Sequence, residues 1–166
     1  MEVISHRGYW RKEEEKNSEL SFQRSFSLNF GTETDFRDFN QKLVISHDIP
    51  NEHNLDVRDF LSLYSKFNLT ASLAINIKCD GLQSKIKELL IEFGLNNYFV
   101  FDMSIPDTIG YIKHQINFFT RQSEYELIPA FYEQAQGVWL DAFNGTWYGP
   151  ELIRNHINNL KKVAIV

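Results

Sequence analysis

The sequence predicts an α/β fold, a TIM-type (β/α) barrel that is incomplete or open at its C-terminal edge and has an antiparallel hairpin after strand 2. Three observations predict it. Short apolar runs alternate with longer amphipathic segments from end to end, which is typical of βα units around a parallel sheet. One connection between two apolar runs is too short for a helical crossover. The chain has 166 residues, whereas a complete barrel typically needs about 250.

The composition is that of one folded domain, and we expect residues 1–166 to form it. Hydrophobic residues make up 43% and charged residues 23% of the chain. The 17 basic and 22 acidic residues give a net charge of −5, which argues against nucleic acid as a partner. A lone cysteine, Cys79, excludes an internal disulfide. Because no secretory signal and no run of about 18 apolar residues is visible, we expect a cytoplasmic protein without membrane insertion.

The chain order of the elements follows from these runs and from local boundary signals. Asp56 is a typical N-cap, Gly94 a helix stop, and Gly149-Pro150 a break followed by a first-turn proline. We expect helices at Ser18–Asn29, Asp56–Lys66, Leu82–Phe93, Pro106–His114, Leu127–Gln134 and Pro150–Leu160. We expect strands at Val3–Ser5, Thr32–Phe36, Leu43–His47, Ser72–Lys78, Tyr98–Asp102, Asn117–Thr120, Gly137–Ala142 and Val163–Val166.

The second and third of these strands form the expected hairpin. Only six residues separate Phe36 from Leu43, whereas a parallel crossover needs about a dozen or more. A turn near Asp38–Gln41 would return His47 alongside Glu33. The remaining strands are then left to form the parallel barrel.

The last expected strand, Val163–Val166, has no later segment to cover it in this sequence. An apolar strand at a sheet edge invites pairing with another chain. Three arrangements are compatible with the pattern: an open barrel, a homo-oligomer in which a partner subunit covers the edge, or a chain cut short of a final helix and strand.

Polar residues recur where the expected strands end. Alternation along 72–78 places Asn76 and Lys78 on the barrel side and Cys79 on the helix side, as a small buried residue. A single polar residue at a strand end is explained by contact with water. Convergence of the whole set at one mouth of the barrel instead indicates an active site. The same alternation places four further pairs of residues on the inward faces of their strands: Ile4 with His6, Glu33 with Asp35, Val100 with Asp102, and Trp139 with Asp141.

Four short motifs follow one another in the first fifty residues: His6-Arg7-Gly8, then Asn17-Ser18 with Ser21-Phe22, then Gly31 to Asp35, then Val44 to Asp48. In this order and spacing they resemble the glycerophosphodiester phosphodiesterase family, within the phosphatidylinositol-phospholipase-C-like phosphodiesterase superfamily. Asn76-Ile77-Lys78 matches more weakly, and from Cys79 onward only the barrel rhythm agrees. The resemblance implies a (β/α)₈ barrel that hydrolyses a glycerol- or polyol-linked phosphodiester into glycerol phosphate and an alcohol.

The family pattern assigns acid and base roles to the residues that match His6 and His47, without deciding which is which. Imidazoles suit these roles because they titrate near neutral pH. For the phosphate, Arg7 offers a guanidinium fork and Lys78 a point charge. These features predict a small-molecule phosphodiester as the substrate.

The same resemblance implies a divalent cation, Mg²⁺ or Ca²⁺, bound by Glu33 and Asp35. Asn76 stands where the family usually has a third carboxylate. An amide oxygen can still coordinate such a cation, but the site loses one formal negative charge, so we expect weaker binding. The alternative is that Asn76 hydrogen-bonds a neighbour and no metal binds.

The other candidate substrate contacts are Arg121, just past a strand end, together with Asp141 and Trp139. Trp139 either stacks on the substrate or fills the barrel, and Trp147 and Tyr148 lie in the loop that follows. We expect three further histidines to be surface residues: His53, His114 and His156.

Two rival functions remain beside the hydrolase. One is a non-catalytic module that binds phosphosugars or phospholipid head groups with a degenerate metal site. The other, a nucleic-acid phosphodiesterase, is disfavoured by the acidic charge balance. Replacing Asn76 with glutamate distinguishes the hydrolase from the binding module, since it would raise the activity of an enzyme and leave a binding module inactive.

Overall fold

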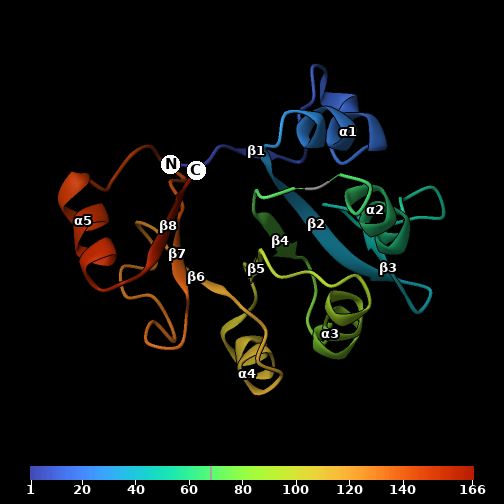
Figure 1. The fold of residues 1–166 in the computed structure, drawn as a ribbon. Coiled ribbons are helices and arrows are strands. Elements are labelled where there is room, and N and C mark those ends of the chain that lie inside the picture. The colour runs from blue at the N-terminus through green and yellow to red at the C-terminus, as the bar shows by residue number, and fades with distance from the viewer. Residues whose placement is uncertain (68) are drawn as a thin grey trace.

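Parallel strands form the centre of the molecule, and helices surround them (Figure 1). The computed structural model describes residues 1–67 and 69–166. None of the helices in these two ranges is long and apolar enough to cross a membrane. The elements are β1 (Ile4–His6), the 3₁₀ helix η1 (Glu13–Glu15), α1 (Glu19–Ser27), β2 (Gly31–Phe39), β3 (Lys42–Ile45), α2 (Val57–Tyr64), β4 (Leu73–Ile77), α3 (Gln83–Glu92), β5 (Tyr98–Phe101), α4 (Ile105–Lys113), β6 (Phe119–Gln122), β7 (Gly137–Leu140), α5 (Pro150–Asn158) and β8 (Lys162–Ile165).

The strands lie in two sheets that follow one another around the centre. The first has the order β1-β2-β4-β5, with β3 on the other side of β2, and the second has the order β6-β7-β8. A single parallel bridge, Val100 to Phe118, connects β5 to the start of the second sheet. Within the described residues no ladder joins β8 to β1, so the barrel is not closed. Both ends of the chain lie beside this gap (Figure 1).

β3 pairs with β2 in antiparallel register, with Phe36 opposite Ile45. The turn between them consists of Asn40 and Gln41, whose φ angles of 47° and 66° are those of a type I′ hairpin turn. β3 ends at Ile45, two residues earlier than expected, so His47 lies just beyond the strand. This register brings Ser46 beside Asp35, whose carbonyl accepts the Ser46 N–H at 3.0 Å. His47 is therefore displaced from the expected position alongside Glu33.

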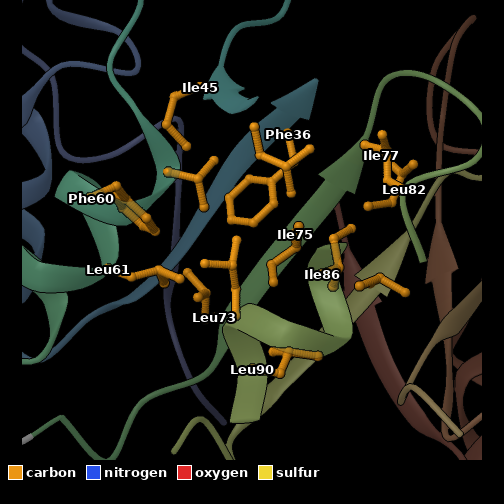
Figure 2. Packing of buried hydrophobic residues seen from close by; sticks show 14 of the residues in the cluster. Phe36, Ile45, Phe60, Leu61, Leu73, Ile75, Ile77, Leu82, Ile86 and Leu90 are labelled. Atoms are coloured by element: carbon orange, nitrogen blue, oxygen red, sulfur yellow. The ribbon is translucent and has the colours of Figure 1, made fainter. Parts of the chain in front are cut away.

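The larger hydrophobic core lies between the sheet and the helices (Figure 2). Leu73, Ile75 and Ile77 of β4 belong to it, so the expected outward parity of this strand is confirmed. Phe60 of α2 is completely buried, and its ring packs edge-on against Phe36 of β2 at 6.3 Å between centroids. This layer fixes β2 and β4, the two strands that bear the carboxylate pair and Asn76.

A smaller aromatic core fills the barrel interior. Phe99 stacks on Phe119 at 3.8 Å and Phe101 stacks on Trp139 at 3.9 Å, with Ala74 beside them. Since Phe99 and Phe101 face inward, Val100 faces the helices, and the expected pairing of Val100 with Asp102 on one inward face is wrong. Asp102 reaches the mouth for another reason. Its φ of 70° breaks the alternation directly after the strand.

The expected helix Leu127–Gln134 is wrong, because this segment is a series of turns. Pro129 disfavours helical geometry at the residue before it, and Phe131 has a φ of 51°. Side chains of β6 also satisfy its carbonyls. Gln122 donates to the Leu127 oxygen at 2.7 Å, and Thr120 donates to the Ala130 oxygen at 2.6 Å. These bonds replace the internal hydrogen bonds that a helix would have made.

His156 is buried, and its expected place at the surface is wrong. It lies on the face of α5 that packs on the second sheet, where its Nε2 is 2.8 Å from Gln122 Oε1. Its Nδ1 is 2.9 Å from the Tyr132 hydroxyl. His53 and His114 are exposed, as expected. The burial lowers the pKa of His156 below its usual 6.5.

We expect acidification to destabilise the fold through His156. Because the unfolded chain binds this proton more readily than the folded one, stability is fully present above about pH 6.5 and is lost as the pH falls through the lowered pKa. Thermal unfolding between about pH 5 and pH 8 should give a smaller slope of Tm against pH in His156→Gln than in the wild type. His114→Gln is the control and should keep the wild-type slope. An unchanged slope in His156→Gln contradicts the prediction.

Candidate active site

Charged side chains of alternating sign line the carboxyl ends of the strands from β1 to β6. Lys78 Nζ lies 3.4 Å from Asp35 Oδ1 and 3.5 Å from Asp102 Oδ2, so it bridges two carboxylates. Arg121 in turn pairs with Asp102 and with Glu126. The network joins strands that are far apart in the sequence into one electrostatic unit. The expected gathering of Glu33, Asp35, Asn76 and Lys78 at one end of β2 and β4 agrees with the ladder between these strands.

His6 and Glu33 are direct neighbours across the β1–β2 ladder. His6 Nε2 lies 3.7 Å from Glu33 Oε2, and the Arg7 backbone N–H donates to that same oxygen at 3.0 Å. Arg7 has a φ of 57° and Gly8 one of 81°, which together turn the chain sharply after β1. A Cβ at position 8 would lie 2.5 Å from the Ser21 hydroxyl oxygen. The glycine of the first motif thus allows α1 to approach the site.

Asp35 is the anchor of the site. It is completely buried, and its Oδ2 lies 3.3 Å from Arg7 Nε. The same oxygen accepts a hydrogen bond of 2.8 Å from Asn17 Nδ2, while Asn17 Oδ1 accepts one of 2.9 Å from the Thr34 hydroxyl. Asn17 therefore holds the Asp35 carboxylate in orientation. Sequence reasoning did not assign it this role, although the second motif contains it.

Burial makes it costly for the carboxylate pair to carry two negative charges. Desolvation and then the neighbouring charge of Asp35 raise the pKa of Glu33 to about 8. Burial, and then the charge of Arg7, lower the pKa of His6 below its usual 6.5, although its side chain is 56% exposed. In the absence of a bound cation, the favoured state near neutral pH is a protonated Glu33 beside a neutral His6.

His47 lies at the rim, with its side chain 42% exposed. Its Nδ1 donates to Asp48 Oδ1 at 2.9 Å, and this bond is the main cause of the lowered pKa of Asp48. His47 and Arg7 line the same surface hollow of about 770 Å³. Arg7 thus connects the two halves of the candidate site, because its backbone binds Glu33, the neighbour of His6. The assignment of both histidines to one reaction stays a prediction.

Arg121 lies within β6 rather than past its end, because this strand begins two residues later than expected. Its guanidinium is held by Asp102 and Glu126, so a phosphate must compete with these carboxylates for it. Asp141 is half-buried nearby, and burial and then the Asp102 charge raise its pKa above the usual range. Asp102 was expected at the mouth, but its pairing with Arg121 was not, and Glu126 was not among the expected site residues. The predicted phosphate contact of Arg121 therefore requires that this network rearrange.

The aromatic candidates lie deeper in the barrel or farther along the rim. Trp139 is 8% exposed and stacks on Phe101, so it fills the barrel as one of the two expectations had it. Trp147 donates its indole N–H to the Asp141 carbonyl at 2.6 Å, which fixes the loop after β7. Cys79 is half-buried, and its thiol donates to Asp38 Oδ1 at 3.0 Å.

Arg37 is a further cation on β2 that was not among the expected site residues. It follows Asp35 by two residues on β2 and therefore shares its inward face. Its Nε is buried and has no hydrogen-bond partner among the described residues. The signal that could have found it is the parity that assigned Glu33 and Asp35, continued for one more step along the strand.

Two solved structures share this architecture. One is a glycerophosphodiester phosphodiesterase from Agrobacterium tumefaciens str. C58, with a TM-score of 0.73, 13% identity, and coverage of 99% of this chain and 86% of that chain. The other is a glycerophosphoryl diester phosphodiesterase from Parabacteroides distasonis ATCC 8503, with a TM-score of 0.69, 12% identity, and coverage of 99% and 70%. This chain has the fold of the glycerophosphodiester phosphodiesterases. No protein-family model and no curated protein matches the sequence.

The oxygen atoms within this glycerophosphodiester phosphodiesterase fold suit a hard divalent cation. On the neighbouring strands β2 and β4, the buried oxygens Glu33 Oε1, Asp35 Oδ1 and Asn76 Oδ1 accept no hydrogen bond from the described residues. Asp35 and Asn76 are direct neighbours across the β2–β4 ladder, and Glu33 shares the face of Asp35. Within the described ranges no three His, Cys, Asp or Glu side chains form a metal-binding group, and the third member of this set is an amide. Carboxylate and amide oxygens are the ligands that Mg²⁺ and Ca²⁺ prefer.

We expect Asn76→Asp to bind Mg²⁺ or Ca²⁺ at least about tenfold more tightly than the wild type. The change restores one negative charge with almost no change in shape, and about 1.4 kcal/mol of added attraction is enough for that factor. Isothermal titration calorimetry with the metal alone measures it. Asn158→Asp adds the same charge at an exposed position of α5 and should leave the affinity unchanged. Equal affinities in all three proteins contradict an Asn76 ligand.

Proposed function

We propose that this protein catalyses metal-assisted hydrolysis of a glycerol- or polyol-linked phosphodiester, with His6 as the base and His47 as the acid. One observation carries the proposal: His6, at the end of β1, lies 3.7 Å from the buried Glu33 of β2, and Asp35 of β2 is flanked by the cations Arg7 and Lys78. A buried carboxylate pair framed by imidazole, guanidinium and ammonium groups fits an anionic ester better than a neutral substrate.

The two histidines differ in surroundings in a way that suits opposite roles. The lowered pKa of His6 keeps its ring neutral near pH 7, the form that accepts a proton from an attacking hydroxyl. His47 donates to the Asp48 carboxylate, which orients the ring as carboxylates orient catalytic histidines elsewhere. In the proposed reaction, His6 takes the proton of the nucleophile and His47 protonates the leaving alkoxide.

The phosphate itself is bound by positive charge. Arg7 offers a guanidinium and Lys78 an ammonium group at the ends of β1 and β4. A divalent cation held by Glu33, Asp35 and Asn76 would neutralise the phosphate charge and polarise its oxygens. Binding of that cation requires Glu33 to lose its proton, and the positive charge of the cation would offset the repulsion between the two ionised carboxylates.

A binding module for phosphosugars or phospholipid head groups is the second candidate. Asn76 favours it, because the amide leaves the oxygen set one negative charge short. Such a module would keep the cations Arg7 and Lys78 but would not cleave the ester. A net charge of −5 makes nucleic acid a poor ligand for either version.

The proposal is tested by hydrolysis of glycerophosphocholine with Mg²⁺, Ca²⁺ or EDTA. We expect release of choline and glycerol phosphate with a metal, loss of this release in EDTA, and its loss in His47→Ala. Equal rates in all samples overturn the hydrolase. If the wild type is inactive but glycerophosphocholine binds, Asn76→Glu decides between the candidates: an active variant supports a weakened enzyme, and an inactive one supports the binding module.

A further inference from the structure

Arg37 is the outermost charged residue on the inward face of β2. Its neighbour Phe36 points into the larger core (Figure 2), so Arg37 points to the opposite, barrel side of the sheet. Val44 of β3 lies directly opposite Arg37. Just after β4, the Lys78 N–H donates to the Phe36 carbonyl at 3.0 Å. Arg37 therefore emerges between β3 and β4, one step beyond Asp35 toward the mouth.

The Arg37 guanidinium differs from the other cations that line the site. Arg7, Lys78 and Arg121 each pair with at least one carboxylate. Among the described residues Arg37 forms no ion pair, and its buried Nε donates no hydrogen bond. A buried N–H of a charged group without an acceptor is unfavourable. Because an oxygen atom of a ligand would satisfy this N–H, the arrangement favours an anion beside Arg37.

Arg37 lies on the side of the site where His47 is. His47 follows β3, the strand that pairs with the outer half of β2, whereas His6 ends β1, which pairs with the inner half. The hydrogen bond with His47 is the main cause of the lowered pKa of Asp48, and the charges of Arg7 and Arg37 add to it. In the proposed reaction His47 protonates the leaving alkoxide. Arg37 is therefore near the alcohol that leaves.

We propose that Arg37 binds a second anionic group, a carboxylate or a phosphate, on the alcohol portion of the phosphodiester. This inference rests on the proposed function, because it places the phosphate that is cleaved at Arg7 and Lys78, the cations that flank Asp35. Two residues of a strand span about 7 Å, so Arg37 begins that far beyond Asp35. An anionic group a few bonds from the phosphorus reaches this distance. The planar fork of the guanidinium suits either group.

A cationic alcohol portion is the alternative, because carboxylates line the hollow beside His47. Two of these carboxylates already have partners: Asp48 accepts a hydrogen bond from His47, and Glu13 accepts one from Lys16. Arg37 has no such partner among the described residues. A second negative charge on the ligand is therefore a better match than a positive one.

Two pairs of esters test the inference, and the members of each pair differ by one anionic group. Glycerophosphoserine carries a carboxylate that glycerophosphoethanolamine lacks, and glycerophosphoinositol 4-phosphate carries a phosphate that glycerophosphoinositol lacks. Isothermal titration calorimetry in EDTA measures Kd for each ester with the full chain. In at least one pair, we expect the ester with the extra group to bind about tenfold more tightly. Arg37→Gln should reduce this ratio to about one. Arg154→Gln removes the same charge from an exposed position of α5 and should retain the ratio.

Hydrolysis of the same esters with Mg²⁺ or Ca²⁺ separates this inference from the proposed function. Hydrolysis with equal Kd values within both pairs overturns the role of Arg37 and leaves the hydrolase. No hydrolysis, but a preference that Arg37→Gln abolishes, supports the anion site although the hydrolase fails. A preference that Arg37→Gln retains, or no measurable binding of any ester, overturns the inference. If Arg37→Gln does not fold, Arg37→Lys keeps the charge without the planar fork and should lower the ratio.

Discussion

Replacing His6 or His47 with asparagine should lower kcat for glycerophosphocholine by about 10²–10⁴-fold, the usual contribution of a positioned acid or base. The two variants should differ on an activated ester. Bis(p-nitrophenyl) phosphate releases p-nitrophenoxide, which needs no proton to leave. We therefore expect His6→Asn to lose activity on both substrates and His47→Asn to lose much less on the activated one.

Steady-state kinetics on both substrates measures the contrast. The matched control is His114→Asn, because this histidine is exposed at the end of α4, where its ring contacts the Gly110 carbonyl at 2.8 Å and the Ser84 hydroxyl at 3.4 Å, away from the candidate site. Loss of the acid limb of the pH–rate profile in His6→Asn would add support, since the lowered pKa of this group places that limb below about pH 6.5. Equal losses of both variants on both substrates contradict the assignment of roles.

Much of the fold follows from local signals in the sequence. The Asp56 side chain caps α2 by accepting the Arg58 N–H at 2.8 Å, and Pro150 begins α5, both as expected. Alternation along 72–78 divided the residues of β4 correctly between the two cores. These signals suffice because each depends on only a few neighbouring residues.

The errors arose where tertiary contacts override local pattern. Leu127–Gln134 has helical composition, but its carbonyls are bound by Thr120 and Gln122 of β6. His156 lies on a helix face that only the packing of α5 against the second sheet identifies as buried. Pro129 is a local signal against the helix, but the other causes cannot be read from either segment alone, because they depend on a strand at least five residues away in the sequence.

The candidate site shows the same division. The motifs located His6, Glu33 and Asp35, and the register of β1, β2 and β4 makes them neighbours. The sequence did not reveal that Asn17 orients Asp35 or that Asp102 bridges Lys78 and Arg121. Asp102 enters through a positive φ, which strand alternation does not describe.

The two buried carboxylates should respond in opposite ways when their charge is removed from the metal-free protein. Asp35 contacts Arg7, Lys78 and Asn17, so Asp35→Asn leaves Arg7 without its carboxylate partner and leaves Lys78 with Asp102 alone. We expect it to lower the free energy of unfolding by about 2–4 kcal/mol, somewhat less than for fully buried pairs because both cations are partly exposed. Asp59→Asn, at an exposed position of α2, should change it by less than about 1 kcal/mol.

Glu33→Gln should instead raise Tm in EDTA. The pKa of Glu33 is raised from 4.5 to about 8, so the stability of the wild type is fully present below about pH 4.5 and is lost as the pH rises through about 8. Glutamine carries no such penalty, and its advantage should grow over this interval to a few kcal/mol at most. Saturating Mg²⁺ should reduce the advantage, because only the ionised wild-type carboxylate binds the cation. Denaturant unfolding of both variants from about pH 5 to pH 9 measures these effects. A destabilised Glu33→Gln at high pH would show that Glu33 is charged and well stabilised without metal, and would remove the electrostatic reason for a cation between Glu33, Asp35 and Asn76.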